Sequence, residues 1–536
     1  MVEAGLIEFY LRHLLTRPFY YDEASRAYEI AKGAGFLADL HIAAAPLALG
    51  WYGIESAARV LLGNTETGLR APMFLVLPVL GAATYLLARH WLRFAVSFCV
   101  AALLLANLWI VNYGLQLKSY SYEALFAVAT VGLYLLTQRR TWRPAQLLGL
   151  YAALGLTCIF SLPNLFVLGP LLVLDLFRTL RARHQAALRV TGEAVAGLIA
   201  LAHYTLFVRL QSVVAGTGFF QAQYPPHGLA AFLQFIYQGL DSYLGGTIIG
   251  VVSADQTPAS YTLPPDAHHL LSLGLLLLLA AGVVAAARDA AGRTLLVVVG
   301  GALLLELIAS ALHQWPFGLI RTNIFVLPLL YILAGMGAVW LARTLTGRQQ
   351  AAKTIAWWRP VATVAVAAVF AGTVAVGAVA TAEGYSETSA MQFKPTMFGG
   401  VKAAVADARE VAGPGDIVII RADRSPAVWY AAPWLYYMNL YQGYPAKIAA
   451  LPRVPSRNTI SVVYVTPRAV DSFLAAHRGS PTVLLLEFNV PGNLFPQSAH
   501  QESLNTLRRF GYCPVSDVAY PLTGQLTVLR GGCAKT

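Results

Sequence analysis

The 536-residue chain has little charge and none of the common motifs of nucleotide or metal chemistry. Only 12% of its residues are charged, against about 25% in a typical soluble domain, while 57% are hydrophobic. This composition excludes an ordinary soluble protein and predicts a chain that crosses a membrane many times. The sequence contains no P-loop, no Gly-x-Gly-x-x-Gly before a helix, no Cys-x-x-Cys and no His-Glu-x-x-His. Their absence argues against nucleotide hydrolysis.

Cysteine is also scarce, with four residues in the whole chain. Cys99 and Cys158 lie in apolar segments and are interpreted as small buried side chains. Cys513 and Cys533 lie in a polar tail and are a candidate disulfide if that tail is outside the cytoplasm. No cleaved signal peptide is recognisable at the start of the chain.

The hydrophobic residues fall into ten segments that are long enough to span a bilayer. A short break at residues 161–164 divides the fourth segment from the fifth, and we interpret the two as separate spans. The predicted spans are 70–88, 94–112, 120–137, 145–160, 162–177, 187–208, 270–287, 294–312, 320–342 and 360–381.

Lys and Arg are distributed unequally between the two sets of loops. Fifteen follow the odd-numbered spans as far as the ninth, and the alternate loops hold only Lys118, Arg209 and Arg321. The positive-inside rule therefore makes the rich side cytoplasmic, and it explains the net charge of +12 without nucleic acid. Residues 18–69, the long loop 209–269 and the tail from about 383 are then outside.

The tail differs from the rest of the chain. Residues 398–411, 467–477 and 501–510 have helical patterns, whereas 416–421, 461–465, 482–488 and 525–529 resemble strands. The predicted fold is an α-helical polytopic membrane protein with about 10 or 11 transmembrane helices and a C-terminal extracytoplasmic α/β domain. Its boundaries are 1–382 and 383–536. Either residues 5–15 form an interfacial helix outside the cytoplasm, or Met1 is an internal start and a first span is missing.

An acid pair stands out in the first outer segment. Asp22 and Glu23 adjoin a membrane core, where carboxylates are costly and tend to be functional. A carboxylate there could act as a general base or a metal ligand. Alternatively, the pair could simply open a helix, since acids favour the helix N-terminus.

The outer loops also place cations at the membrane surface. Lys118 lies at the mouth of a span beside Tyr120, and Arg321 follows His313 at the start of another. Such groups suit a phosphate. The alternatives are a lysine that snorkels to the interface and an arginine that anchors the interface with Trp315.

The same residues carry a resemblance to a known family. RPFYYDEA (17–24), APL (45–47), GNTETGLR (63–70), LKSYS (117–121) and WPFG (315–318) occur in order over most of residues 17–342. The set resembles integral-membrane glycosyltransferases of the C superfamily. The similarity is to the bacterial branch related to protein O-mannosyltransferases and the lipid A aminoarabinose transferase. The chain departs from that pattern in having a single proline at Pro46.

The resemblance implies a bacterial plasma-membrane enzyme that takes a sugar from a polyprenyl phosphate outside the cytoplasm. The acceptor would be a hydroxyl of a glycan, glycolipid or protein, and transfer would invert the anomeric carbon. Asp22 would be the base, supported by Glu23, and Lys118, Tyr120, Arg321 and His313 would hold the phosphate. Whether a divalent metal is needed stays open. The rival hypotheses are a lipid-linked sugar flippase or transporter, and a non-catalytic sensor or assembly protein.

Overall fold

The computed structural model describes most of the chain, and the residues below refer to that part. It covers residues 15, 18–19, 21–33, 47–105, 107, 110, 113–114, 116–139, 142–182, 185–211, 224–249, 265–318, 320–347, 395–411, 416–421, 436–437, 453–455, 461–465, 482–488, 497–520 and 524–532.

The chain divides into two compact units that do not follow the order of the sequence. The first unit comprises Met1–Pro46, Glu55–Leu69 and Ser389–Thr536, so that the N-terminal segment groups with the tail. The second unit comprises Leu47–Ile54 and Arg70–Thr388. Each is described separately.

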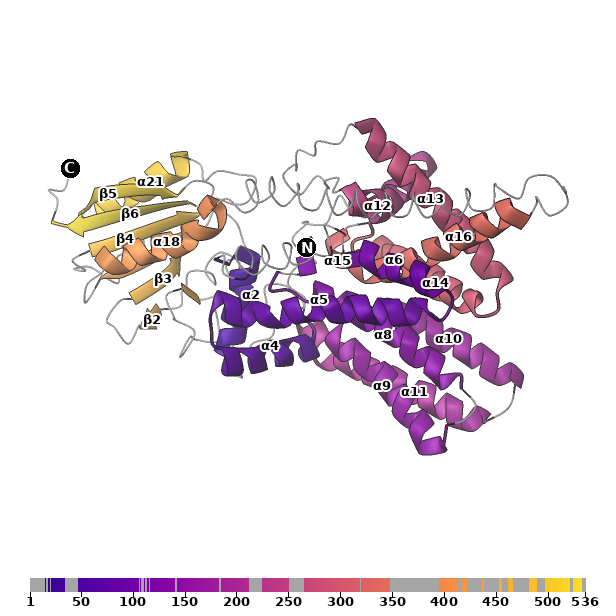
Figure 1. The fold of residues 1–536 in the computed structure, drawn as a ribbon. Coiled ribbons are helices and arrows are strands. Elements are labelled where there is room, and N and C mark those ends of the chain that lie inside the picture. The colour runs from indigo at the N-terminus through magenta and orange to yellow at the C-terminus, as the bar shows by residue number, and fades with distance from the viewer. Residues whose placement is uncertain are drawn as a thin grey trace. The chain divides into compact units, whose positions relative to one another are not determined.

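The second unit is built from helices (Figure 1). Two of them, α4 and α5, begin or end in the first unit. The helices are α4 Leu49–Leu62, α5 Glu66–Ala88, α6 Phe94–Leu105, α8 Tyr120–Thr137, α9 Pro144–Phe160, α10 Asn164–Ala182, α11 Ala186–Leu206, η3 Val208–Gln211, α12 Leu229–Ile249, α13 Pro265–Arg288, α14 Gly292–Ala311, α15 Ile320–Asn323, η6 Ile324–Val326 and α16 Leu327–Gly347.

Five of the described helical segments are long and apolar enough to cross a membrane: Glu66–Ala88, Tyr120–Thr137, Ala186–Gln211, Gly292–Ala311 and Ile324–Thr344. Shorter apolar helices occupy three more of the predicted spans. Residues 145–177 contain the predicted break, because α9 ends at Phe160 and α10 begins at Asn164. That each of the two helices spans the membrane stays a prediction. The predicted span 360–381 lies outside the described residues. The structure differs from the prediction at 209–269, where α12 adds a 21-residue apolar helix to the expected loop.

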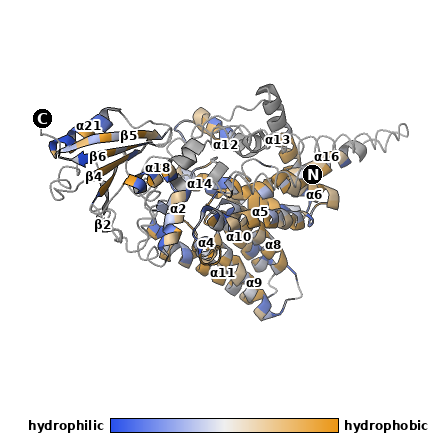
Figure 2. Ribbon diagram, turned by 60° about the vertical axis from the view of Figure 1, so that its left-hand side comes forward, coloured by the Kyte–Doolittle hydropathy of each residue, from blue (hydrophilic) through white to orange (hydrophobic). Residues whose placement is uncertain are grey.

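The exposed surface of these helices is apolar, as expected where lipid replaces water. Leu86 in α5, Val173 in α10 and Leu198 in α11 are each at least 64% exposed. By contrast, 83% of an 18-residue stretch within Ile324–Thr344 is buried, so this stretch is surrounded by other helices. Figure 2 shows the hydrophobic colouring along the helices of the second unit.

Two glycines let the backbones of α13 and α16 approach closely. A Cβ on Gly282 of α13 would overlap the carbonyl of Leu333, and one on Gly337 of α16 would overlap that of Leu278. Small residues of this kind allow membrane helices to pack by close van der Waals contact. The close packing of α13 on α16 therefore depends on Gly282 and Gly337.

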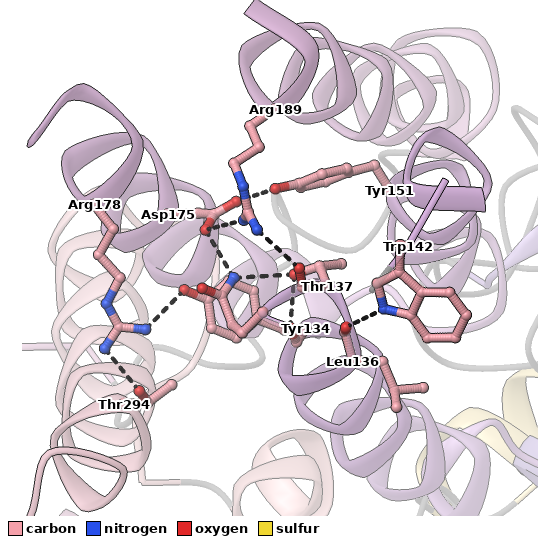
Figure 3. A network of polar contacts seen from close by, with 10 residues as sticks. Tyr134, Leu136, Thr137, Trp142, Tyr151, Asp175, Arg178, Arg189 and Thr294 are labelled. Carbon is pink, nitrogen blue, oxygen red and sulfur yellow. Dashed lines mark hydrogen bonds and ion pairs between the residues drawn. The ribbon is translucent and has the colours of Figure 1, made fainter. Parts of the chain in front are cut away.

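A buried polar network joins helix ends that were expected to face the cytoplasm (Figure 3). Asp175 of α10 is fully buried, accepts hydrogen bonds from Tyr151 and from Gln138 Nε2 (2.8 Å), and pairs with Arg189 Nη1 at 3.6 Å. The sequence did not single out Asp175, although it lies within a predicted span. Its partners sit on α9, the end of α8 and α11, so the network ties four helices together. Figure 3 shows further contacts made by Tyr134, Thr137, Arg178 and Thr294.

The first unit contains a mixed sheet with helices (Figure 1). The strand order is β2-β3-β1-β4-β6-β5, in which β1 pairs in parallel with β3 and β4 and the other pairs are antiparallel. The elements are α2 Tyr21–Lys32, α18 Pro395–Val411, β1 Ile417–Arg421, β2 Arg453–Pro455, β3 Ser461–Val465, β4 Thr482–Phe488, α21 Gln497–Arg509, β5 Tyr512–Tyr520 and β6 Gly524–Gly531.

This sheet confirms that the tail is an α/β fold. Its core forms where alternate residues of β1 and β4, such as Ile419 and Leu485, meet Leu504 and Leu507 of α21. The predicted helix 467–477 lies outside the described residues. Cys513 in β5 is disulfide-bonded, whereas Cys99 and Cys158 are free. Cys533 lies outside the described residues, so its pairing with Cys513 stays a prediction.

Candidate active site

The predicted acid pair lies at the start of α2, in the first unit. Asp22 is the second residue of the helix, and its side chain is outside the described part of the structure. Glu23 follows it and is only 1% exposed. The pair thus occupies the first turn, where the helix dipole favours negative charge. A helix-opening role and a chemical role are compatible at this position.

The helix α2 is polar and yet buried. Residues 23–31 are all buried, although charged residues are almost never fully buried unless they are paired. Arg26 and Glu29 form such a pair, with Nη1 and Oε2 2.6 Å apart. At the other end of the helix, Arg59 of α4 donates to the Ala31 carbonyl oxygen at 2.5 Å, where a cation suits the helix C-terminus. No local pattern in the sequence indicates this burial, which holds in place the helix that carries Asp22.

A further buried carboxyl in the same unit, Glu55, was not foreseen. Glu55 of α4 is fully buried, and neither of its carboxylate oxygens has a hydrogen-bond partner among the described residues. The helix α4 is not among the candidate membrane spans. Burial alone raises the pKa of Glu55 well above its usual value, because the charged form loses its hydration. Burial therefore favours the protonated, neutral form of this side chain.

The second unit contains the first pair of predicted phosphate-binding residues, Lys118 and Tyr120, at the start of α8. Lys118 is half-buried, and its Nζ lies 5.6 Å from the centroid of the Tyr120 ring. Tyr120 in turn meets Tyr113 edge to face at 5.4 Å between ring centroids. A further contact, from Ser119 Oγ to Glu123 Oε1 at 2.6 Å, ties the first turn of the helix. The structure thus brings Lys118 and Tyr120 together, at a helix N-terminus where anions are favoured.

The second pair of predicted phosphate-binding residues, His313 and Arg321, lies before and within α15. His313 is exposed, takes a left-handed backbone conformation (φ 57°) and packs its ring on Tyr224 at 4.5 Å. Asn323 holds the following turn, accepting from Trp315 Nε1 at 2.6 Å and donating to the Pro316 carbonyl at 2.8 Å. Arg321 lies in α15 beside Asn323, and its side chain is outside the described part.

The two pairs of predicted phosphate-binding residues are connected by the packing of η6 on α8. The segment η6, which directly follows α15, is buried and packs on α8, the helix that begins at Tyr120. The sequence reasoning missed Asn323, whose amide orders the turn next to Arg321. Among the described residues, no group of three His, Cys, Asp or Glu side chains is arranged to hold a metal ion.

His203 of α11 is a hydrogen-bonded helix histidine. Its Nε2 accepts from the backbone N–H of Leu49 at 3.4 Å, and its ring stacks on Phe207. Glu306 of α14 is fully buried, as its place inside a predicted span required. Neither residue belongs to the candidate site.

Sequence and structure comparisons give different results. No protein-family model matches the chain, and no curated protein matches its sequence. Among solved structures, ArnT from Cupriavidus metallidurans in the apo state matches over 99% of this chain and 98% of its own, with a TM-score of 0.54 at 14% identity. The chain has the fold of ArnT. The structure of ArnT bound to undecaprenyl phosphate matches with the same coverage, TM-score and identity.

A further neighbour is less similar than ArnT. The archaeal oligosaccharyltransferase AglB from Archaeoglobus fulgidus, in complex with an inhibitory peptide and a dolichol-phosphate, matches 90% of this chain and 68% of its own. Its TM-score is 0.47 at 12% identity. At 14% identity, the likeness to ArnT shows the fold, and the role of each residue needs its own evidence.

Proposed function

We propose that this chain is a membrane glycosyltransferase that moves a sugar from a polyprenyl-phosphate carrier to an acceptor hydroxyl. The observation that carries the proposal is the ArnT fold, which extends over both chains from end to end. ArnT has been solved with undecaprenyl phosphate bound, which is the lipid that such a donor would release. Helix α2, in which Glu23 is buried, would supply the base, and Lys118 and Tyr120, which contact each other, would bind the leaving phosphate.

In the proposed reaction, Asp22 takes the proton from the acceptor hydroxyl as its oxygen attacks C1 of the sugar. The bond between C1 and the phosphate oxygen breaks, and the polyprenyl phosphate leaves with the electron pair. Attack opposite the leaving group inverts C1. Glu23, buried beside Asp22, would support the base.

The leaving phosphate gains negative charge, so the rate depends on cations and hydrogen-bond donors placed before it departs. Lys118 and Arg321 would supply the charge, with Tyr120 and His313 as further phosphate contacts. The packing of η6 on α8 supports this assignment, because it couples the two segments that carry the cations. The protein would lie in a bacterial plasma membrane with residues 18–69, 209–269 and the tail outside.

Binding of undecaprenyl phosphate tests the phosphate assignment. In nanodiscs, we expect Lys118→Ala to weaken binding of this lipid by about tenfold or more, since hydrogen bonds to charged groups are worth about 1.5–3 kcal/mol. Lys118→Arg should retain part of the affinity. Arg93→Ala is the matched control, because Arg93 is an exposed cation assigned to the opposite face. Equal affinities for Lys118→Ala and Arg93→Ala would place the phosphate elsewhere.

The rival function is movement of a lipid-linked sugar across the membrane without transfer. A transferase and a flippase could both bind the lipid, so binding alone does not distinguish the two functions. Proteoliposomes loaded with a labelled donor do: the transferase releases free undecaprenyl phosphate and a labelled acceptor, whereas a flippase changes only the leaflet of an intact donor.

A further inference from the structure

The start of α2 is tied to the C-terminal part of the chain within the first unit. The backbone N–H of Phe19, three residues before Asp22, donates to the hydroxyl oxygen of Tyr437 at 2.6 Å. The two residues are 418 positions apart in the sequence. Phe19 and Tyr437 are 1% and 9% exposed, so this hydrogen bond is shielded from water. A buried backbone N–H needs such a partner, because leaving it unpaired is costly.

The Tyr437 hydroxyl is itself held from the other side. It donates to Glu66 Oε1 at 3.4 Å, and Lys402 Nζ of α18 lies 2.6 Å from the same oxygen. The hydroxyl therefore accepts from Phe19 and donates to Glu66, which uses both of its hydrogen-bonding roles. Glu66 is the first residue of α5, so the contact joins the segment before α2, the start of α5 and the C-terminal domain.

A second tyrosine fixes the direction of the first. Tyr436 packs edge to face on Phe19, with ring centroids 5.6 Å apart, and its hydroxyl donates to the Asn64 carbonyl at 3.2 Å. The adjacent rings of Tyr436 and Tyr437 also meet edge to face at 5.3 Å. Tyr436 and Tyr437 thus contact the chain at two places: at Phe19, just before α2, and at Asn64, just before α5.

We propose that Tyr437 is a positioning residue for the transfer reaction, which makes the C-terminal domain part of the catalytic apparatus. Its hydroxyl fixes the backbone at Phe19 and thereby the first turn of α2, where Asp22 lies. The inference rests on the proposed function of Asp22 as base. A base that is misplaced by about 1 Å can cost up to about 100-fold in rate, so we expect loss of this hydroxyl to lower turnover.

Tyr437→Phe tests the proposal in the full-length protein. It removes one oxygen and keeps the ring, so the aromatic contacts with Tyr436 remain. The matched control is Tyr520→Phe, which removes a hydroxyl that donates to Asp407 inside the C-terminal domain. Turnover is measured in proteoliposomes with undecaprenyl-phosphate donors that each carry one radiolabelled pentose or hexose, and with glycan, glycolipid and peptide acceptors. Hydrogen exchange of residues 15–24 and binding of undecaprenyl phosphate are measured on the same preparations.

For Tyr437→Phe we expect faster exchange at the Phe19 amide, kcat lower by about 10- to 100-fold and unchanged affinity for undecaprenyl phosphate. Tyr520→Phe should leave all three readouts at the level of the unaltered protein. Unchanged kcat in Tyr437→Phe overturns the positioning role, whether or not exchange at Phe19 rises. Equal losses of kcat and lipid affinity also overturn it, because they indicate general damage. Absence of transfer by the unaltered chain is a failure of the proposed function instead.

Discussion

The close contact between α13 and α16 predicts opposite effects for two Gly→Ala substitutions in membrane helices. At Gly337, a new Cβ would overlap the Leu278 carbonyl oxygen and lie 2.6 Å from the Gly282 backbone nitrogen. Both neighbours are backbone atoms, so the helices must move apart. Overpacking costs typically about 1–3 kcal/mol, and a backbone clash belongs at the upper end, so we expect Gly337→Ala to destabilise by about 3 kcal/mol.

Gly300 of α14 is the matched control. A Cβ there would meet nothing within 4 Å, and alanine is favoured over glycine in helices by up to about 1 kcal/mol. Gly300→Ala is therefore expected to be neutral or slightly stabilising. The free energy of unfolding is measured by SDS titration in mixed micelles. A thiol-reactive dye reports unfolding, because the free Cys158 is 1% exposed and becomes accessible when the helices separate. Equal stability of the two variants would refute the close packing of α13 on α16.

Two further predictions concern buried charge. Burial raises the pKa of Glu55, so the folded protein keeps a proton that the unfolded chain releases near pH 4.5. The stability that this group contributes is fully present below pH 4.5 and is lost as the pH rises towards the pKa in the folded protein. Over that pH window, the unfolding free energy of Glu55→Gln should therefore increase relative to that of the unaltered protein by up to about 1.4 kcal/mol per pH unit. A difference in unfolding free energy that does not depend on pH would contradict this. In the polar network, Arg189→Ala leaves the fully buried Asp175 without its cation and is expected to cost about 3–5 kcal/mol. Tyr151→Phe removes one hydrogen bond to Asp175 and should cost about 0.6 kcal/mol, the average for such bonds in membranes; the same SDS titration compares the two, and equal costs would argue against the ion pair.

The sequence predicted the elements that depend on local pattern. Hydropathy located the described spans and the break before Asn164, and short apolar runs located β1, β3, β4 and β6. Strand β5 was missed because Pro514 and an irregularity in register between Pro514 and Ser516 interrupt its pattern, and most of its side chains are exposed. Helix α12 was missed because polar residues and glycines interrupt its apolar run.

The candidate site was predicted only in part, for a related reason. Their charge on the predicted outer segments drew attention to Asp22, Lys118 and Arg321, and the order of the motifs supported the choice. Neither signal carries information about contacts between distant segments. The bond between Phe19 and Tyr437 spans 418 positions, and nothing local to either residue indicates it. The burial of α2 is likewise a tertiary property, since its own sequence is polar and resembles that of an exposed helix.

Sugar transfer by Asp22→Asn is the measurement that tests the central claim most directly. The unaltered protein and the variant are reconstituted in proteoliposomes with the labelled undecaprenyl-phosphate donors and acceptors described above, and folding is checked by binding of undecaprenyl phosphate. The account predicts transfer with inversion at C1 by the unaltered protein, and a loss of about 100- to 10,000-fold in Asp22→Asn with lipid binding retained. Transfer by a folded Asp22→Asn protein at the rate of the unaltered protein would contradict it.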